Sequence, residues 1–361
     1  MNILYISALE GGKYTGPIYS VPNQIEAQSK IDNVYWVNLT QIDKANIKKG
    51  VECHMLFWKD FSLDKLPHPF DKPHLVVFEE FFKIENYRVY KIVNKSKLPY
   101  VIVPRGSMTY QYLEHKKMEK LVASVLLFNK FKNNAMAVQF LTTQEQQDSK
   151  QFYNKRSILV PNGIHLPEHG KKITEKNKIV GTFIGRYSIV QKGLDILLEA
   201  IYRQKELLER YKVRFDFYGP DERSGSHGDI TALVEKYKLN DMVSVNGPVF
   251  DEEKAKVLEK SDFFIHTSRF EGLPMAVLEA LAYGVPCLVT EGSNVRNEIE
   301  SFDAGWGADT NVEGVEKALI QMTESLGKIE SFSSNAVLLA EKYSWDSIAE
   351  DTHNKYEELL V

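Results

Sequence analysis

Short runs of apolar and β-branched residues alternate with longer amphipathic stretches along the whole chain. Buried strands of parallel sheets consist of such continuous apolar runs, and the stretches between them are long enough for helices, so the pattern predicts repeated βαβ units. In the first half we expect strands at Asn2–Ser7, Val34–Leu39, Leu75–Phe78, Tyr100–Val103, Val138–Thr142 and Ser157–Val160. In the second half we expect them at Ile179–Ile184, Val213–Tyr218, Met242–Val245, Phe263–His266 and Pro286–Thr290.

The pattern breaks at Pro161–Lys178, which is the best candidate for a domain boundary. The turn sequence Pro161-Asn162-Gly163 opens this segment, a polar lysine-rich stretch follows, and a new strand begins at Ile179. The 361 residues are also more than one hydrophobic core usually serves. We therefore expect two α/β domains of similar size, with ligands bound between them, outside the carboxyl ends of the strands.

Composition is that of an ordinary globular protein, with 43% hydrophobic and 26% charged residues. Cys53 and Cys287 are the only cysteines, and their spacing to other residues suits neither a disulfide framework nor a metal site. The first residues predict a strand rather than a signal peptide, and no apolar run reaches the roughly 18 residues that span a bilayer. We expect a cytoplasmic protein without a nucleic-acid partner.

A strand–loop–helix segment early in the second half has the chemistry of a phosphate site. Gly185 and Arg186 follow the strand, a loop is expected up to Gln191, and Lys192-Gly193 opens a helix. Apolar residues at i, i+3, i+4 and i+7 mark that helix, namely Leu194, Leu197, Leu198 and Ile201. Two cations and a helix N-terminus aimed at one spot would stabilise a departing diphosphate. The alternative is a Rossmann-like turn with two surface cations.

An acidic loop follows the strand Phe263–His266. Glu271 stands before the next expected helix and Glu279 inside it, with seven residues between them. Pro274 suits the first turn of that helix, where its missing N–H costs nothing. The amides at the start of this helix that could receive a phosphate are those of Gly272, Leu273 and Met275.

The two carboxylates of this loop are suited to sugar hydroxyls, because each offers two acceptor oxygens. Glu279 lies on an otherwise apolar helix, where a carboxylate is costly unless it has a partner. This cost favours a binding role for Glu279. The alternative is a polar residue on a packed helix.

At these two segments the sequence resembles the family 4 glycosyltransferases, a retaining family with the GT-B fold. The resemblance covers most of the chain and is strongest in Gly185–Gly193 and Ser268–Thr290, where the E-x7-E motif matches. It extends to Pro161-Asn162-Gly163-Ile164 and to Tyr343-Ser344-Trp345. These motifs are specific for the family and carry no information about the substrate.

The resemblance implies an α/β GT-B fold, with two Rossmann-like domains facing each other across a cleft. An N-terminal acceptor-binding domain would occupy residues 1–165, and a C-terminal nucleotide-sugar domain residues 175–343. A C-terminal helix within 344–361 would return to the first domain.

The resemblance also implies roles for the donor site. Arg186 and Lys192 would neutralise the donor diphosphate, Glu271 would hold the transferred sugar, and Glu279 would bind the ribose hydroxyls. The other donor-binding residues it implies are Gly16, Gly185, Val249, Phe250, Gly272, Leu273, Pro274 and Met275. The chain has no D-x-D sequence, and the family needs no metal, so we expect no cofactor besides the nucleotide sugar.

The first half offers fewer signals. Gly12 and Gly16 belong to a glycine loop after the first strand that resembles the family's acceptor loop. Arg105, in Pro104-Arg105-Gly106, stands where many members have a histidine, and we expect it to be a catalytic cation that faces the sugar or the acceptor. The alternative for Arg105 is a salt bridge. Glu79 and Glu80 could touch acceptor hydroxyls, or they could be solvated loop carboxylates.

The chain has a net charge of −4, which is unevenly distributed: residues 1–170 are net basic and the remainder is net acidic. A basic half suits an anionic partner such as lipid headgroups or phosphates, and chance asymmetry is the alternative. Lysines also flank an apolar segment between His115 and Lys132, which could rest on a membrane surface or form a buried helix.

The P-R-G sequence recurs among family members that build surface polysaccharides such as capsule, often on lipid-linked saccharides. The resemblance thus implies a metal-independent retaining hexosyltransferase that uses a UDP-linked or other nucleotide sugar and a saccharide acceptor, expected to be lipid-linked. A peripheral contact of the N-terminal domain with the inner membrane face would fit this role. The alternatives are a catalytically silent nucleotide-sugar-binding partner of another transferase and a GT-B nucleotide-sugar epimerase.

Overall fold

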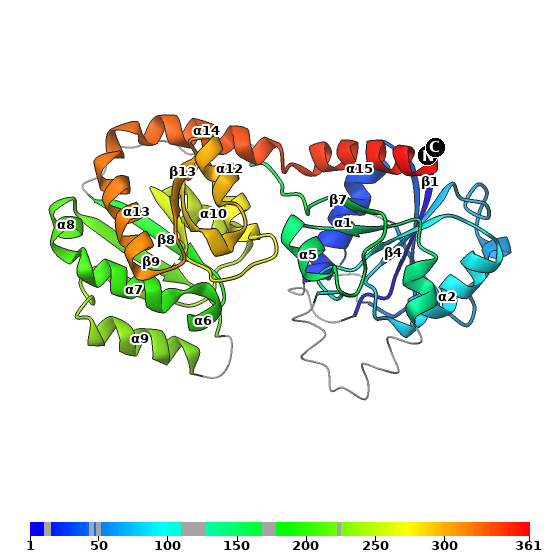
Figure 1. Cartoon of the computed structure of the whole chain (residues 1–361), viewed down its shortest axis with the longest axis horizontal. Helices are drawn as coiled ribbons and strands as arrows, with labels where there is room; N and C mark the ends of the chain where they lie inside the picture. Colours follow the sequence, from blue (N-terminus) through cyan, green and yellow to red (C-terminus); the bar gives the residue numbers. More distant parts are fainter. Residues whose placement is uncertain (11–15, 43–46, 48–51, 110–127, 168–177, 222–224) are drawn as a thin grey trace. The chain divides into compact units, whose positions relative to one another are not determined.

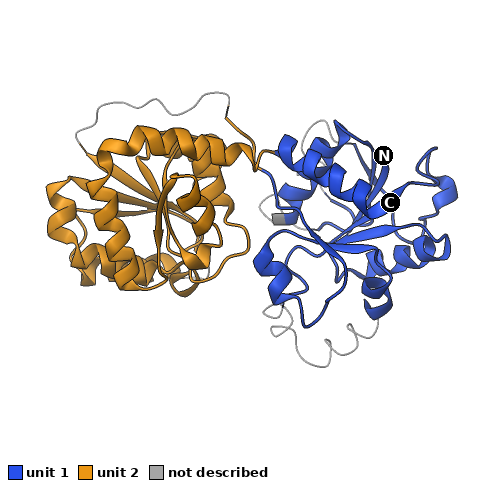
Figure 2. Ribbon diagram, turned by 45° about the horizontal axis from the view of Figure 1, so that its top comes forward, with its two compact units in different colours: residues 1–163, 345–361 blue, residues 164–344 orange. Residues whose placement is uncertain are grey.

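The computed structural model describes residues 1–10, 16–42, 47, 52–109, 128–167, 178–221 and 225–361. These residues form two compact units (Figure 2). Unit 1 comprises Met1–Gly163 and Trp345–Val361, and unit 2 comprises Ile164–Ser344. The chain therefore passes between the units at Gly163–Ile164 and again at Ser344–Trp345, whereas the resemblance implied domain limits at 165, 175 and 343.

Unit 1 is built on a parallel sheet, of which Figure 1 labels β1, β4 and β7. Within the described residues its strand order is β3-β2-β1-β4-β5-β6-β7. Its strands are β1 (Asn2–Ser7), β2 (Asn33–Asn38), β3 (Cys53–Met55), β4 (Leu75–Glu79), β5 (Tyr100–Val103), β6 (Ala137–Phe140) and β7 (Ser157–Leu159). Its helices include α1 (Gly16–Ser29), the 3-10 turn η2 (Leu63–Lys65), α2 (Ile84–Lys95), α5 (Thr143–Asp148) and α15 (Trp345–Leu360).

Unit 2 is built on a second parallel sheet, with the described strands in the order β10-β9-β8-β11-β12-β13. The strands are β8 (Ile179–Ile184), β9 (Val213–Tyr218), β10 (Val243–Asn246), β11 (Phe263–His266), β12 (Cys287–Thr290) and β13 (Gly305–Ala308). The helices are α6 (Ile189–Lys192), α7 (Leu194–Arg203), α8 (Lys205–Arg210), α9 (Ser226–Lys236), α10 (Asp251–Lys260), α11 (Met275–Ala282), α12 (Arg296–Ser301), α13 (Val312–Glu324) and α14 (Ile329–Glu341). The described part of unit 2 also contains the 3-10 turns η3 (Glu291–Ser293) and η4 (Leu326–Lys328).

Both sheets are buried on their two faces, as the continuous apolar runs predict. In β1, Ile3 and Tyr5 belong to one hydrophobic cluster of unit 1 and Leu4 and Ile6 to another, because alternate side chains point to opposite faces. In unit 2, the four apolar residues that marked α7 are all fully buried: Leu194, Leu197, Leu198 and Ile201. The predicted α/β fold class is confirmed at the level of each unit.

Each predicted strand is present, with ends that differ from the prediction by two residues at most. Two further strands, β3 and β13, were missed. β13 has the sequence Gly-Trp-Gly-Ala, and glycine is depleted in strands, while β3 is three residues long and carries a histidine. Both are edge strands of their sheets in the described part of the chain, where pairing with one neighbour suffices.

The C-terminal helix α15 belongs to unit 1, as the resemblance implied, and packs along α1. Trp345 lies against Gly163, where an added Cβ would come within 2.5 Å of the indole ring. Farther along α15, His353 Nδ1 lies 3.0 Å from Asp32, and the Tyr356 hydroxyl donates to Gln139 Oε1 at 2.7 Å. These contacts tie the end of the chain to the turn before β2 and to β6.

Candidate active site

The carboxyl end of β8 leads into the turn that carries the predicted phosphate-binding cations. The Gly185 N–H donates to the Tyr218 carbonyl at 3.0 Å, which extends the pairing with β9 past the strand end. The prediction of a loop up to Gln191 is wrong, because Ile189–Lys192 form one helical turn, α6. Gly193, with a φ of 61°, then separates α6 from α7. A Cβ at Gly193 would lie 2.1 Å from the Thr267 carbonyl oxygen, so the backbone contact requires glycine.

Lys192 forms an ion pair with Glu271, although the two residues are 79 positions apart in the sequence. Glu271 Oε1 also accepts a hydrogen bond from Ser268 Oγ at 3.0 Å and lies 3.2 Å from His266 Nε2. The side chains of Lys192 and Glu271 are only 12% and 11% exposed. The structure thus joins a cation of the phosphate-binding segment to the first carboxylate of the acidic loop.

The electrostatics of this cluster keep Glu271 ionised. Burial lowers the pKa of His266, so its ring is neutral at pH 7 and can donate from Nε2 to Glu271. Burial by itself would raise the pKa of Glu271. The hydrogen bond from His266, the positive charge that this ring gains on acidification and the charge of Lys192 outweigh burial and lower the pKa to about 2. An ionised carboxylate accepts hydrogen bonds only, which suits it to sugar hydroxyls.

His266 and Ser268 were not singled out from the sequence as site residues. His266 is the last residue of the buried strand β11, and both side chains are buried. The signal that could have found them is a polar residue at the carboxyl end of a buried parallel strand, immediately before the acidic loop.

The second carboxylate, Glu279, lies one helical turn beyond Met275 on α11. Pro274 precedes the first residue of this helix, and its carbonyl accepts from the Val277 N–H at 2.9 Å. Lys254, on α10, donates to both carboxylate oxygens of Glu279 at 2.8 Å. No sequence pattern singles out Lys254, because α10 carries charged residues on several sides.

The other predicted donor residues lie on the same carboxyl side of the second sheet or just beyond it. Arg186 follows Gly185, and its guanidinium donates to Gln191 Oε1 at 3.4 Å. Phe250 is the residue before α10 and is 40% exposed, and Val249 packs on the core of unit 2. Asn294 donates through its side-chain amide to the Glu271 carbonyl at 2.5 Å, which fixes the backbone before Gly272.

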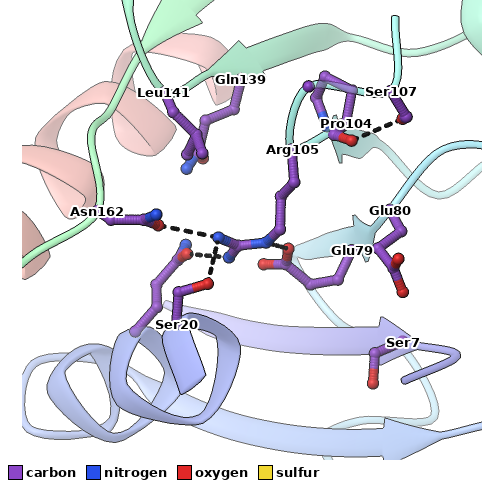
Figure 3. A network of polar contacts seen from close by, with 12 residues as sticks. Ser7, Ser20, Glu79, Glu80, Pro104, Arg105, Ser107, Gln139, Leu141 and Asn162 are labelled. Atoms are coloured by element: carbon purple, nitrogen blue, oxygen red, sulfur yellow. Dashed lines mark hydrogen bonds and ion pairs between the residues drawn. The ribbon is translucent and has the colours of Figure 1, made fainter. Parts of the chain in front are cut away.

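In unit 1, Arg105 lies at the centre of a buried polar network (Figure 3). Its Nε donates to Glu79 Oε2 at 2.7 Å, and Nη1 donates to Ser20 Oγ and Asn162 Oδ1, each at 2.9 Å. Nη2 donates to Gln24 Oε1 at 2.7 Å. The side chain of Arg105 is 4% exposed. The salt bridge, which was the alternative for this residue, is what the structure shows.

The two neighbouring glutamates differ from each other in exposure. Glu79 is the last residue of β4 and fully buried, so it is not a solvated loop carboxylate. Glu80, with a φ of 65°, is partly exposed and lies 3.7 Å from Lys83 Nζ. Burial raises the pKa of Glu80. Of the two, Glu80 is the one that an acceptor could reach.

Two predictions fall on segments outside the described residues. Gly12 is one of them, whereas Gly16 is the first residue of α1. Most of the lysine-flanked stretch between His115 and Lys132 is the other. Among the described residues, no helix is both long and apolar enough to cross a membrane. No group of three or more His, Cys, Asp or Glu side chains there is arranged to hold a metal ion.

Comparison with known proteins identifies the second unit. Residues 165–337 match the family described as glycosyl transferases group 1. This region is a group 1 glycosyltransferase domain. It contains Arg186, Lys192, Glu271 and Glu279, so the four residues selected for the donor lie within the matched region. The resemblance stated from the sequence is confirmed.

Two curated relatives extend the match. Over 122 residues, 32% of this chain and 29% of the relative, the chain is 31% identical to WcaL of Escherichia coli, named as a colanic acid biosynthesis glycosyltransferase. Over 351 residues, 92% of this chain, it is 24% identical to the poly(glycerol-phosphate) alpha-glucosyltransferase of Bacillus subtilis and covers 46% of that enzyme. The chain therefore spans less than half the length of either relative.

Among solved structures, the chain resembles Anabaena HepE in complex with UDP, with a TM-score of 0.72 and 15% identity. The match covers 99% of this chain and 100% of that chain. At this identity the likeness concerns the fold, and it confirms the GT-B class for the chain that holds the glycosyltransferase domain.

Proposed function

We propose that the chain transfers a hexose from a UDP-linked sugar to a saccharide acceptor in the biosynthesis of a surface polysaccharide. The observation that carries this proposal is the Lys192–Glu271 pair, because it places a cation beside an ionised carboxylate at the carboxyl end of a parallel sheet. The names of the relatives support it, since they concern colanic acid and poly(glycerol-phosphate), and the HepE structure contains UDP.

The donor would bind with its diphosphate near Arg186 and Lys192 and its sugar near Glu271. Phosphate binding there would compete with the Lys192–Glu271 pair, leaving Glu271 for the sugar hydroxyls. Glu279 would take the ribose, and the backbone of Gly272–Met275 would lie along sugar and phosphate. Two fixed cations can offset the charge that develops on the leaving diphosphate, so we propose that transfer needs no metal ion and no cofactor.

Transfer would follow the retaining course that the resemblance implies. The bond between the anomeric carbon and the β-phosphate oxygen breaks, and the acceptor oxygen bonds to the same face of the sugar. The departing phosphate oxygen takes the proton of the acceptor hydroxyl. The acceptor would be lipid-linked and would meet unit 1 at the inner face of the membrane, which suits the basic charge of residues 1–170.

The experiment that tests this proposal is a thermal-shift series of the full chain with UDP, GDP, ADP and their sugar conjugates, with and without EDTA. Stabilisation by uridine nucleotides alone, unaffected by EDTA, is the expected result, because ligands that bind the native state raise its stability. No shift with any nucleotide would contradict the donor site. A shift that EDTA abolishes would contradict metal independence. In a separate incubation of the nucleotide sugar without acceptor, conversion of the sugar into its epimer would favour the epimerase.

A further inference from the structure

Arg269 connects the two segments that carry Lys192 and Glu271. Its Nη1 donates to Asp195 Oδ1 at 2.7 Å and to the Val190 carbonyl at 2.8 Å, and its Nη2 donates to Asp195 Oδ2 at 2.7 Å. Its backbone N–H donates to the Gln191 carbonyl at 2.8 Å. We call Arg269 with Asp195, Val190 and Gln191 the Arg269 clamp.

The Arg269 clamp spans the residues on both sides of Lys192. Val190 and Gln191 precede Lys192 in α6, and Asp195 is the second residue of α7. On the other segment, Arg269 stands two positions before Glu271. One planar guanidinium, with donors in a fixed fork, therefore sets the distance between the backbones that carry the cation and the carboxylate.

Contacts next to the Arg269 clamp restrict movement of the Lys192 segment relative to the Glu271 segment. Thr267 Oγ1 donates to the Lys192 and Gly193 carbonyls at 3.1 and 3.2 Å. On the other side of the loop, the Thr290 hydroxyl donates to the Ser268 carbonyl at 2.7 Å, and a Cβ on Gly292 would lie 2.4 Å from the Arg269 carbonyl oxygen. The loop is thus held between the α6 turn and the end of β12, and the Arg269 side chain binds both α6 and α7.

The exposure of the clamp indicates that its main contribution is geometric. The side chains of Arg269 and Asp195 are 30% and 41% exposed, and ion pairs at that exposure add little to folding stability. A bidentate pair that also binds a main-chain carbonyl nevertheless fixes orientation. Displacement of a reacting group by about 1 Å can reduce turnover by about two orders of magnitude.

We propose that Arg269 is a positioning residue, which acts through Val190, Gln191 and Asp195 to place Lys192 against the departing diphosphate and Glu271 against the sugar. This role rests on the proposed transferase function. Arg269 is not required to touch the donor. Its loss should therefore lower the rate of the chemical step much more than it lowers donor affinity.

The test uses the full chain with Arg269→Ala, Arg269→Lys and Asp195→Asn. Arg203→Ala is the matched control, because Arg203 is a similarly exposed arginine at the opposite end of α7 that also binds carboxylates. Hydrogen–deuterium exchange is followed in peptides covering 186–193 and 266–272. UDP affinity is measured by calorimetry, and turnover by release of UDP from the UDP-sugar that stabilises the wild type.

We expect Arg269→Ala to accelerate exchange in both peptides and to lower kcat about tenfold or more, with UDP affinity changed less than about threefold. Arg269→Lys should restore part of kcat, because lysine can reach Asp195 but cannot also hold Val190. Asp195→Asn should also accelerate exchange in both peptides and lower kcat, each by less than Arg269→Ala does. Arg203→Ala should change neither the exchange nor kcat.

The outcomes separate the clamp from the function on which it rests. If hydrogen–deuterium exchange in both peptides is unchanged in Arg269→Ala, the proposed positioning role is overturned, even if activity is lost. Equal losses of kcat and UDP affinity also overturn it, because they would show that Arg269 binds the donor itself. If the wild type binds no nucleotide, the proposed function fails, and the exchange of the two peptides still decides whether Arg269 couples them.

Discussion

Lys254 donates a hydrogen bond to each carboxylate oxygen of Glu279, both at 2.8 Å. Glu279 therefore has a partner on α10 in addition to any ligand it binds. Each carboxylate oxygen can accept two hydrogen bonds, so the contacts with Lys254 leave acceptor positions for two ribose hydroxyls. Lys254 would then orient the carboxylate rather than compete with the donor.

Glu279→Gln should weaken UDP binding about tenfold, because a charge-assisted acceptor is replaced by a neutral amide with a single acceptor oxygen. The effect on kcat should be smaller, since the ribose is bound equally in the ground and transition states. Isothermal titration calorimetry with UDP measures the affinity. The control Glu259→Gln makes the same charge change at an exposed position of α10. Unaltered affinity in Glu279→Gln would show that Glu279 is structural.

Lys192→Ala and Arg186→Ala should each lower turnover by about two orders of magnitude, as the removal of a donor to a developing charge does. UDP release from the UDP-sugar with acceptor present measures this loss. Lys205→Ala, which removes a surface lysine of α8, serves as the control and should leave turnover unchanged. Full activity in folded Lys192→Ala would contradict the diphosphate assignment.

The sequence predicted the strands and the two motif segments of unit 2 because both depend on local patterns. Apolar runs locate β8 and β11, and polar residues at their carboxyl ends locate Lys192 and Glu271. The ion pairs between residues of different elements could not be predicted from local patterns. Lys254 and Glu279 lie on different helices, so the contact depends on how α10 and α11 pack, which no local pattern encodes.

Unit 1 shows the same limit at Arg105. A cation after a strand end predicts a ligand site as readily as a buried salt bridge. The salt bridge requires a carboxylate buried beside the cation, and Glu79 supplies one, while the catalytic role of Arg105 stays a prediction. The exposure of Glu79 could not be read from the sequence, because it follows the run Leu75–Phe78 at the point where the strand was expected to end.

The pH dependence of stability should identify the ion pair at the donor site. The pKa of Glu271 is about 2 in the folded chain and 4.5 in its ordinary state. A carboxyl group with a depressed pKa stabilises the fold above its ordinary pKa, and this contribution is lost as the pH falls toward the folded value. The contribution amounts to about 3 kcal/mol at most.

Glu271→Gln should therefore unfold at lower denaturant concentration than the wild type at pH 7. The difference should stay constant down to about pH 5 and then shrink as the pH falls further, because the unfolded wild type begins to take up its proton near 4.5. Urea unfolding at a series of pH values measures this difference, with hydrogen exchange in peptides of residues 179–344 as the readout. A difference that grows on acidification would contradict the assigned charge of Glu271.

Arg105→Met should destabilise unit 1 by about 3–5 kcal/mol, because it leaves the fully buried Glu79 without its cation. The double variant Arg105→Met with Glu79→Gln removes both charges and should regain most of this loss, which urea unfolding can measure. Turnover of the double variant then decides between the two roles of Arg105. Recovery of turnover together with stability would establish a structural salt bridge, whereas a stable double variant without turnover would mean that the guanidinium also acts on the sugar or the acceptor.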